Sequence, residues 1–396
     1  MKGEHMERKL KLGIIGIGNM GGGHLNNYAL GRMPEIEITC VADIDERRFE
    51  NAREKAPGVV CFNTATELIN SGLCEAVLIA TPHYFHPPIA IEALNAGLHV
   101  MSEKPAGVYT KQVRELIEVA SHSDKTYAIM FNQRTNCVYR KVKELVSGGE
   151  YGEIRRVNWI ITDWFRTQQY YNSGGWRATW SGEGGGVMLN QCPHQLDLWQ
   201  WICGMPSKIR AFCHVGKWHN IEVEDDVTIY AEYPNGATGT FVTSTGDFPG
   251  TNRLEITLDK AKIICENDPK EGFVIRLCEL EEGTQEFINT SNEGFGNIKC
   301  EWKNVETDGK NEQHQGVMNA FAAHILRGEP LIAEGKEGIN GLTISNAAFL
   351  SSWLDKTVEI PFDEELYYEL LEEKIKNSKF VKVVNEQIQE DMSSTF

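Results

Sequence analysis

LKLGIIGIGNMG, residues 10–21, is the stretch that decides the fold, because an apolar strand candidate leads directly into glycines in G-x-G-x-x-G spacing. Gly16 supplies a tight turn, Gly18 lets the backbone approach a pyrophosphate, and Gly21 allows the next helix to pack closely on the strand. The motif alone is weak, since glycine-rich turns are common. Residues 24–33 are a helix candidate, so the glycines lie between a predicted strand and a predicted helix, as the dinucleotide-binding motif requires.

Asp43 stands at the end of a second strand candidate, residues 35–45, and lies 22 residues beyond Gly21. A carboxylate at that point accepts hydrogen bonds from the adenosine ribose hydroxyls and repels a 2'-phosphate, which favours NAD over NADP. The alternative is a strand-end cap. Arg47 and Arg48 follow closely, so the preference needs a direct test.

Strand and helix candidates alternate up to residue 134, which predicts a doubly wound parallel sheet with crossover helices over residues 1–134. The strand candidates are 75–82, 99–105 and 126–134, and the helix candidates are 46–56, 87–97 and 110–123. Such folds bind ligands at the carboxyl ends of their strands. The residues expected to contact the cofactor are Gly16, Gly18, Asn19, Met20, Gly21, Asp43, Thr81, Pro82, His86, Glu103 and Lys104. For His86 a contact or structural role is favoured over metal binding, because two prolines follow it in a loop.

The pattern changes after residue 134. Strand candidates without crossover helices between them predict a largely antiparallel sheet, so residues 135–396 are expected to form an α+β domain for substrate binding and oligomerisation. These candidates are 155–165, 208–216, 227–245, 253–266, 272–281 and 284–291, with a hairpin turn at Asn235-Gly236. Late helices at 313–328 and 339–356 are expected to pack on one sheet face, and residues 363–396 to form a surface helix and a frayed tail.

GEGGGVMLNQCPHQLDLWQW, residues 182–201, is the candidate catalytic stretch. Its flexible glycine run leads into a segment of helical period, in which helix begins either near Val187, with a kink, or at Pro193. Both versions group an amide, an imidazole and a carboxylate, which are Asn190, His194 and Asp197. We expect His194 to accept a hydroxyl proton, Asp197 to orient its ring and Asn190 to bind substrate. The alternative is a buried histidine satisfied by an aspartate, which is often only structural.

Six of the nine tryptophans fall between Trp159 and Trp201, and several aromatic residues share a loop just before the catalytic stretch. Exposed aromatic faces beside Arg166 and Arg177 suit a polyol or sugar ring, whose C–H face is apolar and whose rim carries hydroxyls. The expected substrate contacts are Arg134, Trp164, Arg166, Trp176, Arg177, Asn190 and His194. The alternative for the aromatic loop is an oligomer contact.

Composition limits the class of partner. The chain has 396 residues, enough for two domains, and its formal net charge of -17 argues against nucleic acid and anionic membranes as partners. The ten cysteines form no C-x-x-C pair, so no metal site is expected and we expect reduced thiols in a cytoplasmic protein. Residues 1–9 are polar and no run is long and apolar enough for a bilayer, so neither a secretory segment nor a membrane span is expected.

The chain resembles the glucose-fructose oxidoreductase and inositol dehydrogenase (Gfo/Idh/MocA) family over roughly residues 10–360. In order, the resemblance rests on G-x-G-x-x-G, Asp43, Thr81-Pro82, Glu103-Lys104-Pro105, and Gly184-Gly185-Gly186 followed by Asn190, His194 and Asp197. It implies an N-terminal Rossmann domain, a C-terminal open sheet, a nicotinamide between them, and catalytic roles for Lys104 and His194. One departure concerns Asn190, where inositol dehydrogenases of the family carry aspartate. Because asparagine cannot take a proton, we expect it to hydrogen-bond substrate, and Asn190→Asp to be tolerated.

The activity implied is NAD-dependent oxidation of a secondary ring hydroxyl of a sugar, cyclitol or glycoside. In it His194 is the base and Lys104 stabilises the alkoxide. Two alternatives stay open: an NAD-dependent glycosidase that oxidises its sugar transiently, and a noncatalytic NAD-binding sensor. We also expect a homodimer or homotetramer, because the open sheet leaves a face that needs a cover.

Overall fold

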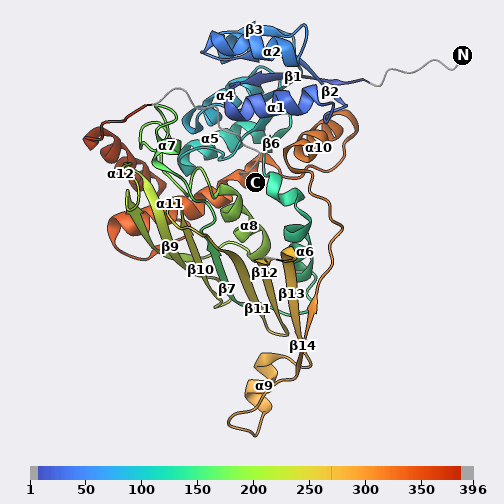
Figure 1. Cartoon of the computed structure of the whole chain (residues 1–396), viewed down its shortest axis with the longest axis vertical. Coiled ribbons are helices and arrows are strands. Elements are labelled where there is room, and N and C mark those ends of the chain that lie inside the picture. The colour runs from blue at the N-terminus through green and yellow to red at the C-terminus, as the bar shows by residue number, and fades with distance from the viewer. Residues whose placement is uncertain (1–7, 269, 385–396) are drawn as a thin grey trace, which may run out of the picture.

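The computed structural model describes residues 8–268 and 270–384, which form two domains, each built on one sheet (Figure 1). The first sheet is parallel, with the strand order β3-β2-β1-β4-β5-β6. The second has the order β14-β13-β12-β11-β7-β10-β9-β8-β15, in which β7 and β10 run parallel and the other neighbours run antiparallel. The fold class predicted from the sequence is therefore confirmed.

The first domain alternates strands with helices, as the sequence pattern predicts. Its elements are β1 (Leu10–Ile15), α1 (Asn19–Ala29), β2 (Ile36–Ala42), η1 (Glu46–Arg48), α2 (Phe49–Lys55), β3 (Val60–Phe62), α3 (Ala65–Ile69), β4 (Ala76–Ile79), η2 (His83–Phe85), α4 (His86–Asn95), β5 (His99–Ser102), α5 (Thr110–Ser121) and β6 (Tyr127–Ile129). Strands β1 and β4 at its centre are almost wholly apolar and buried, as strands covered on both faces must be.

The glycine turn between β1 and α1 has the geometry that its spacing predicts. Gly16 has a φ of +86°, a left-handed conformation that favours glycine. A Cβ at Gly21 would lie 1.9 Å from the carbonyl oxygen of Gly16, so α1 can approach β1 this closely only without a side chain there. Both glycines are therefore required by the fold itself, before any cofactor binds.

The second domain is a large sheet with helices on one side. Its elements are η3 (Asn132–Thr135), α6 (Cys137–Ser147), β7 (Ile154–Ile161), α7 (Gln168–Tyr171), α8 (Pro193–Cys203), β8 (Lys208–Val215), β9 (Glu224–Glu232), β10 (Thr238–Ser244), β11 (Asn252–Leu258), β12 (Ala261–Asp268), β13 (Gly272–Leu280), α9 (Thr284–Thr290), β14 (Cys300–Asn304), α10 (Gln313–Arg327), η4 (Gly335–Glu337), α11 (Gly338–Leu354), β15 (Val358–Glu359) and α12 (Glu364–Asn377). The inner sheet face carries Trp159 and Phe241, and Trp199 of α8 stacks on Phe241 with ring centroids 5.3 Å apart. Helix α8 thus packs on the sheet, and helices α6 and α11 also contact it.

The expected hairpin at Asn235-Gly236 is present. Strands β9 and β10 pair antiparallel on either side of it, and Gly236 has a φ of +85°. The amide of Tyr233 donates to the carbonyl of Ala237, which closes the turn.

Two expectations about the second half are wrong. Residues 284–291 were predicted as a strand but contain helix α9, which lies at the far tip of the molecule in Figure 1. The late helices do not share one sheet face: α11 packs on β8 and α8, whereas α10 returns to the first domain. There Val317 and Phe321 of α10 are buried in one cluster with Leu12 of β1. The expected surface helix is α12; beyond it Ser378 and Lys382 contact other parts of the chain, and residues 385–396 of the predicted tail lie outside the described residues.

Candidate active site

Lys104 connects the two domains at the carboxyl end of β5. Its Nζ donates a hydrogen bond to the backbone oxygen of Asn190, in the turn before α8, at 3.0 Å. The preceding Glu103 is buried and accepts from Nε2 of His24 on α1 at 2.8 Å. Burial alone would raise the pKa of Glu103, but this hydrogen bond and nearby positive charge outweigh it and lower the pKa to about 2. The carboxylate therefore stays ionised beside Lys104.

Helix α8 begins at Pro193, which resolves the two alternatives for this stretch. Pro193 occupies the first turn, where its missing N–H removes no helical hydrogen bond. His194 follows in the same turn and is 3% exposed, and Asn190 reaches the site from the preceding turn. Burial lowers the pKa of His194 well below its usual range, and the positive charge of Lys104 lowers it further. The imidazole is therefore neutral at pH 7, as a general base must be.

Asp197 does not take the role expected of it. Its two carboxylate oxygens accept hydrogen bonds from Arg134, at 2.7 and 2.8 Å, and one also accepts from Gln200 at 2.9 Å. The side chains of Arg134 and Asp197 are 2% and 1% exposed. Arg134 was expected to bind substrate and Asp197 to orient His194. The structure corrects both expectations, because the two residues form a buried ion pair that joins η3 to α8.

The glycine run is closely packed rather than flexible. A Cβ at Gly184 would lie 2.1 Å from the side chain of Val108, and one at Gly186 would lie 2.0 Å from the backbone of Glu224. The Glu224 carboxylate accepts hydrogen bonds from the amides of Gly186 and Met188 at 2.8 and 2.9 Å. Glu224, at the start of β9, therefore fixes the turn that carries Asn190, and no local sequence signal marked it.

Glu183 is a second buried carboxylate that sequence reasoning missed. One of its oxygens accepts a hydrogen bond from the side-chain amide of Asn190, and the other accepts from the backbone amide of Ala178 at 2.5 Å. Burial raises the pKa of Glu183, although Arg177 and these hydrogen bonds act in the opposite direction. Its position inside G-E-G-G-G was visible in the sequence, but its contact with Asn190 depends on how the turn folds.

The expected cofactor residues gather along the carboxyl edge of the parallel sheet. Helix α1 begins at Asn19, so Met20 and Gly21 lie in its first turn, where backbone N–H groups and the helix dipole attract phosphate. Asp43 accepts from the amide of Ile17 at 2.8 Å, so it also caps the glycine turn. Arg48 lies 3.4 Å from the same carboxylate.

Farther along this edge, Thr81 and His86 flank the end of β4. The hydroxyl of Thr81 is buried, and no described residue bonds to it. Pro82 follows Thr81 and caps η2. His86 contacts the carbonyls of Thr81 and Pro105 at 2.7 and 2.8 Å, so it ties the ends of β4 and β5 together, as a structural role requires. A glycine turn, a helix N-terminus, a carboxylate at the end of β2 and a buried hydroxyl without a described partner lie on one edge and fit a dinucleotide.

The aromatic loop divides into two groups. Trp164 and Trp176 are partly exposed, and the guanidinium of Arg177 lies over Trp176 and over Tyr170, 5.0 and 4.3 Å from the ring centroids. Arg166 lies over Trp164 in the same way, at 6.0 Å. Tyr171 and Trp180 are buried instead, so the expectation of exposed aromatic faces fails for these two.

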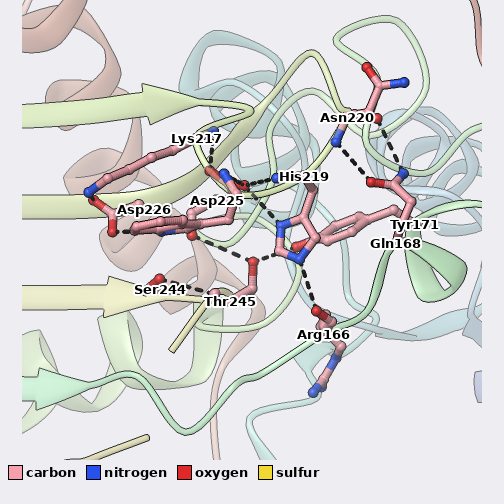
Figure 2. Close-up of polar contacts among 12 residues, drawn as sticks. Arg166, Gln168, Tyr171, Lys217, His219, Asn220, Asp225, Asp226, Ser244 and Thr245 are labelled. Atoms are coloured by element: carbon pink, nitrogen blue, oxygen red, sulfur yellow. Dashed lines mark hydrogen bonds and ion pairs between the residues drawn. The ribbon is translucent and has the colours of Figure 1, made fainter. Parts of the chain in front are cut away.

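A buried histidine–aspartate pair anchors this loop, as Figure 2 shows. His219 contacts Asp225 through Nδ1 and the backbone oxygen of Arg166 through Nε2, both at 2.9 Å. Burial alone would lower the pKa of His219, but its bonds to Asp225 and Arg166 raise it above the usual value. Tyr171 packs on the His219 ring and contacts the hydroxyl of Thr245 at 2.7 Å. The pair therefore holds the Arg166 segment on the end of the large sheet.

The segment after α12 also reaches the site. Ser378 donates to the carboxylate of Glu222, and Nζ of Lys382 donates to the backbone oxygen of Tyr171. Burial lowers the pKa of Lys382, while the negative charge of Glu183 opposes the shift. Among the described residues, no group of His, Cys, Asp and Glu side chains could hold a metal ion, and no helix is long and apolar enough to cross a membrane.

These features define a class of protein, an oxidoreductase-type chain with a dinucleotide-binding Rossmann domain. Comparison with known proteins identifies the family. Residues 10–131 match the oxidoreductase family NAD-binding Rossmann fold, and residues 139–264 match the GFO/IDH/MocA C-terminal domain. These two regions together cover more than half of the chain, which therefore belongs to the Gfo/Idh/MocA family and has an NAD-binding Rossmann domain.

Individual relatives agree with this assignment. Inositol 2-dehydrogenase of Corynebacterium glutamicum is 32% identical over 200 residues, which are 50% of this chain and 56% of that protein. The match thus spans little more than half of the relative's length. The WlbA dehydrogenase of Bordetella pertussis, solved with NADH and UDP-GlcNAcA, superposes with a TM-score of 0.75 at 22% identity, over 90% of this chain and 99% of that one. Levoglucosan dehydrogenase in complex with NADH superposes with a TM-score of 0.74 at 19% identity, over 90% of this chain and 100% of that one.

Proposed function

We propose that this protein oxidises a secondary ring hydroxyl of a sugar, cyclitol or glycoside with NAD. The observation that carries the proposal is the 3.0 Å hydrogen bond between Nζ of Lys104 and the backbone oxygen of Asn190. It brings the Rossmann strand end that carries Lys104 to the turn beside His194. In this proposal Lys104 as a cation and His194 as a neutral imidazole act on one substrate oxygen, as alcohol oxidation requires.

The chemistry follows from the protonation states. Neutral His194 accepts the hydroxyl proton, and Lys104 donates a hydrogen bond to the same oxygen as negative charge develops on it. Glu103 and Glu183 hold negative charge near Lys104 and oppose the lowering of its pKa by burial. Bound NAD supplies the hydride acceptor, C4 of the nicotinamide. The alcohol leaves as a ketone once the proton and hydride have departed.

The binding surface suits a hydroxylated ring. The partly exposed Trp164 and Trp176 offer apolar ring faces, and Arg166 beside Trp164 offers a charged hydrogen-bond donor. Arg177 is instead buried against Trp176 and Tyr170. The similarity to inositol 2-dehydrogenase supports a cyclitol or sugar over other alcohols. Asn190 adds an amide at the point where the two domains meet.

The test is a substrate panel. Incubating the protein and NAD with myo-inositol, D-glucose, levoglucosan and aryl glycosides, while recording NADH absorbance, should give turnover with a cyclitol or sugar. Aglycone release from the glycosides without NADH accumulation would replace this proposal with the glycosidase alternative. Tight NAD binding without turnover on any panel member would favour a noncatalytic sensor.

We further propose a homodimer or homotetramer assembled through the outer face of the large sheet. Ile160, Val242, Thr228 and Phe212 are successive cross-strand partners and so share one face. Ile160 and Phe212 are 42% and 51% exposed, an apolar stripe that suits an interface. Sedimentation of a 44.6 kDa monomer at micromolar concentration would contradict this proposal.

A further inference from the structure

The amide of Asn190 is held in one orientation by Glu183. A carboxylate can only accept hydrogen bonds, so the group of Asn190 that faces Glu183 must be the NH2. This settles an assignment that amide geometry alone leaves ambiguous. The amide oxygen Oδ1 is therefore turned away from Glu183, and no described residue donates a hydrogen bond to it.

Burial raises the pKa of Glu183, but a hydrogen-bond donor at each of its two oxygens favours the ionised form. Its second oxygen accepts from the amide of Ala178, whose φ of +58° places it in a left-handed turn. The positive charges of Arg177 and Lys382 also favour the carboxylate. Because the Ala178 amide belongs to the backbone, it cannot turn to accommodate a different partner. Glu183 thus has two donors, of which the Ala178 amide is fixed, and needs two acceptor oxygens.

We propose that Glu183 is a positioning residue: it turns Asn190 so that Oδ1 accepts a hydrogen bond from a substrate hydroxyl next to the one oxidised. This inference rests on the proposed function, and it assigns Asn190 as the acceptor that binds the substrate hydroxyl adjacent to the oxidised one. The backbone oxygen of the same residue holds Lys104. Asn190 therefore links the reacting oxygen to the recognition of its neighbour.

The structure also reverses one expectation from the sequence. Asn190→Asp was expected to be tolerated, but it would place a second carboxylate against Glu183 in a buried setting. Like charges at that distance cannot both ionise, so one must take a proton or move away. We now expect this variant to be impaired.

The test exchanges the two groups. In Glu183→Gln the one oxygen of the new glutamine accepts from the Ala178 backbone amide, so the glutamine NH2 faces Asn190. The Asn190 side chain must then turn its oxygen toward that NH2, and it presents its own NH2 to substrate. KM should rise roughly 10- to 100-fold, with little change in kcat, because the lost hydrogen bond is to a hydroxyl that does not react. Asn190→Asp should also lower kcat/KM, through repulsion.

The double variant, which combines Glu183→Gln with Asn190→Asp, restores a matched donor and acceptor. The carboxylate introduced at position 190 accepts from the amide introduced at position 183 and keeps one oxygen for substrate. Because the two substitutions are in contact and compensate each other, kcat/KM should recover to within about threefold of the unsubstituted protein.

Glu224→Gln is the matched control, since Glu224 is a second buried acidic side chain whose two oxygens accept hydrogen bonds, in its case from two backbone amides. Adding Asn190→Asp to it should not restore kcat/KM. The substrate is the fastest member of the panel above, and circular dichroism and NAD affinity check folding of each variant. Independent, multiplying losses in the double variant at positions 183 and 190, or an unchanged KM in Glu183→Gln, would overturn the inference. His194→Ala assayed in parallel separates the two proposals: its full activity would refute the proposed function itself.

Discussion

Asp197→Ala tests whether this residue stabilises the fold or orients the catalytic histidine. The variant removes both acceptors of the Arg134 guanidinium, which lie at 2.7 and 2.8 Å. Arg134 would keep one ion-pair partner, Glu337, which is 31% exposed. The Arg134 guanidinium would therefore stay buried but lose the buried carboxylate that neutralises it.

The expected loss is large. Removing one partner of a buried ion pair destabilises a protein by about 3–5 kcal/mol, against a total stability of about 5–15 kcal/mol for a typical domain. Replacing both partners by Arg134→Met and Asp197→Leu should cost much less, because no buried charge is left unpaired and Glu337, which loses Arg134, is 31% exposed. The exposed pair of Arg140 and Asp308 gives the control: Asp308→Ala should lose less than about 1 kcal/mol.

Urea unfolding followed by tryptophan fluorescence measures these differences, and NADH formation by the folded variants measures turnover. The account predicts a lower unfolding midpoint for Asp197→Ala, with kcat changed little under conditions where the variant is folded. Unchanged stability with turnover reduced about 100-fold would refute the reasoning, because Asp197 would then act on His194 instead.

Other predictions follow from single contacts. Gly21→Ala should abolish NAD binding or folding, because its Cβ meets a backbone oxygen. Gly23→Ala in the same helix meets nothing within 4 Å and should leave stability unchanged or slightly raised. Calorimetry measures NAD affinity and thermal stability for both variants. Asp43→Ser should narrow the preference for NAD over NADP in a calorimetric titration with each cofactor. An unchanged ratio of the two affinities would mean that Asp43 does not set this preference. Because the pKa of His194 is lowered, its base form persists through pH 6.5, so kcat/KM should fall only at more acidic pH. As pH falls below about 6.5 the unfolded chain takes up a proton on His194 before the folded protein does, so the free energy of unfolding should decrease. His194→Asn should make the free energy of unfolding, measured by urea denaturation, less dependent on pH in this range.

The sequence predicted those features that depend on neighbouring residues. The glycine turn needs only Gly16, Gly18 and Gly21 in the right spacing, and the hairpin at Gly236 needs only its own backbone. Pro193 limited the start of α8 to two alternatives, because proline is compatible with a first turn but not with a straight helix interior.

The sequence could not predict contacts made by distant segments. Arg134 lies 63 residues from Asp197, and nothing in either segment indicates the pair. The closer His194 was the natural partner on helical spacing alone. Glu224 likewise reaches the catalytic stretch, and Lys382 the aromatic loop before it, only through tertiary folding. The return of α10 to the first domain was missed for the same reason, since its packing partners on β1 and α1 are far away in the sequence.

The most direct measurement of the central claim is turnover of Lys104→Ala and His194→Ala with the panel substrate, beside their affinity for NAD. The account predicts that each variant loses a factor on the order of 10² to 10⁴ in kcat while NAD affinity changes little. The double variant should lose less than the product, because the two groups act on one oxygen. Full activity in His194→Ala, with folding and NAD binding intact, would contradict the account.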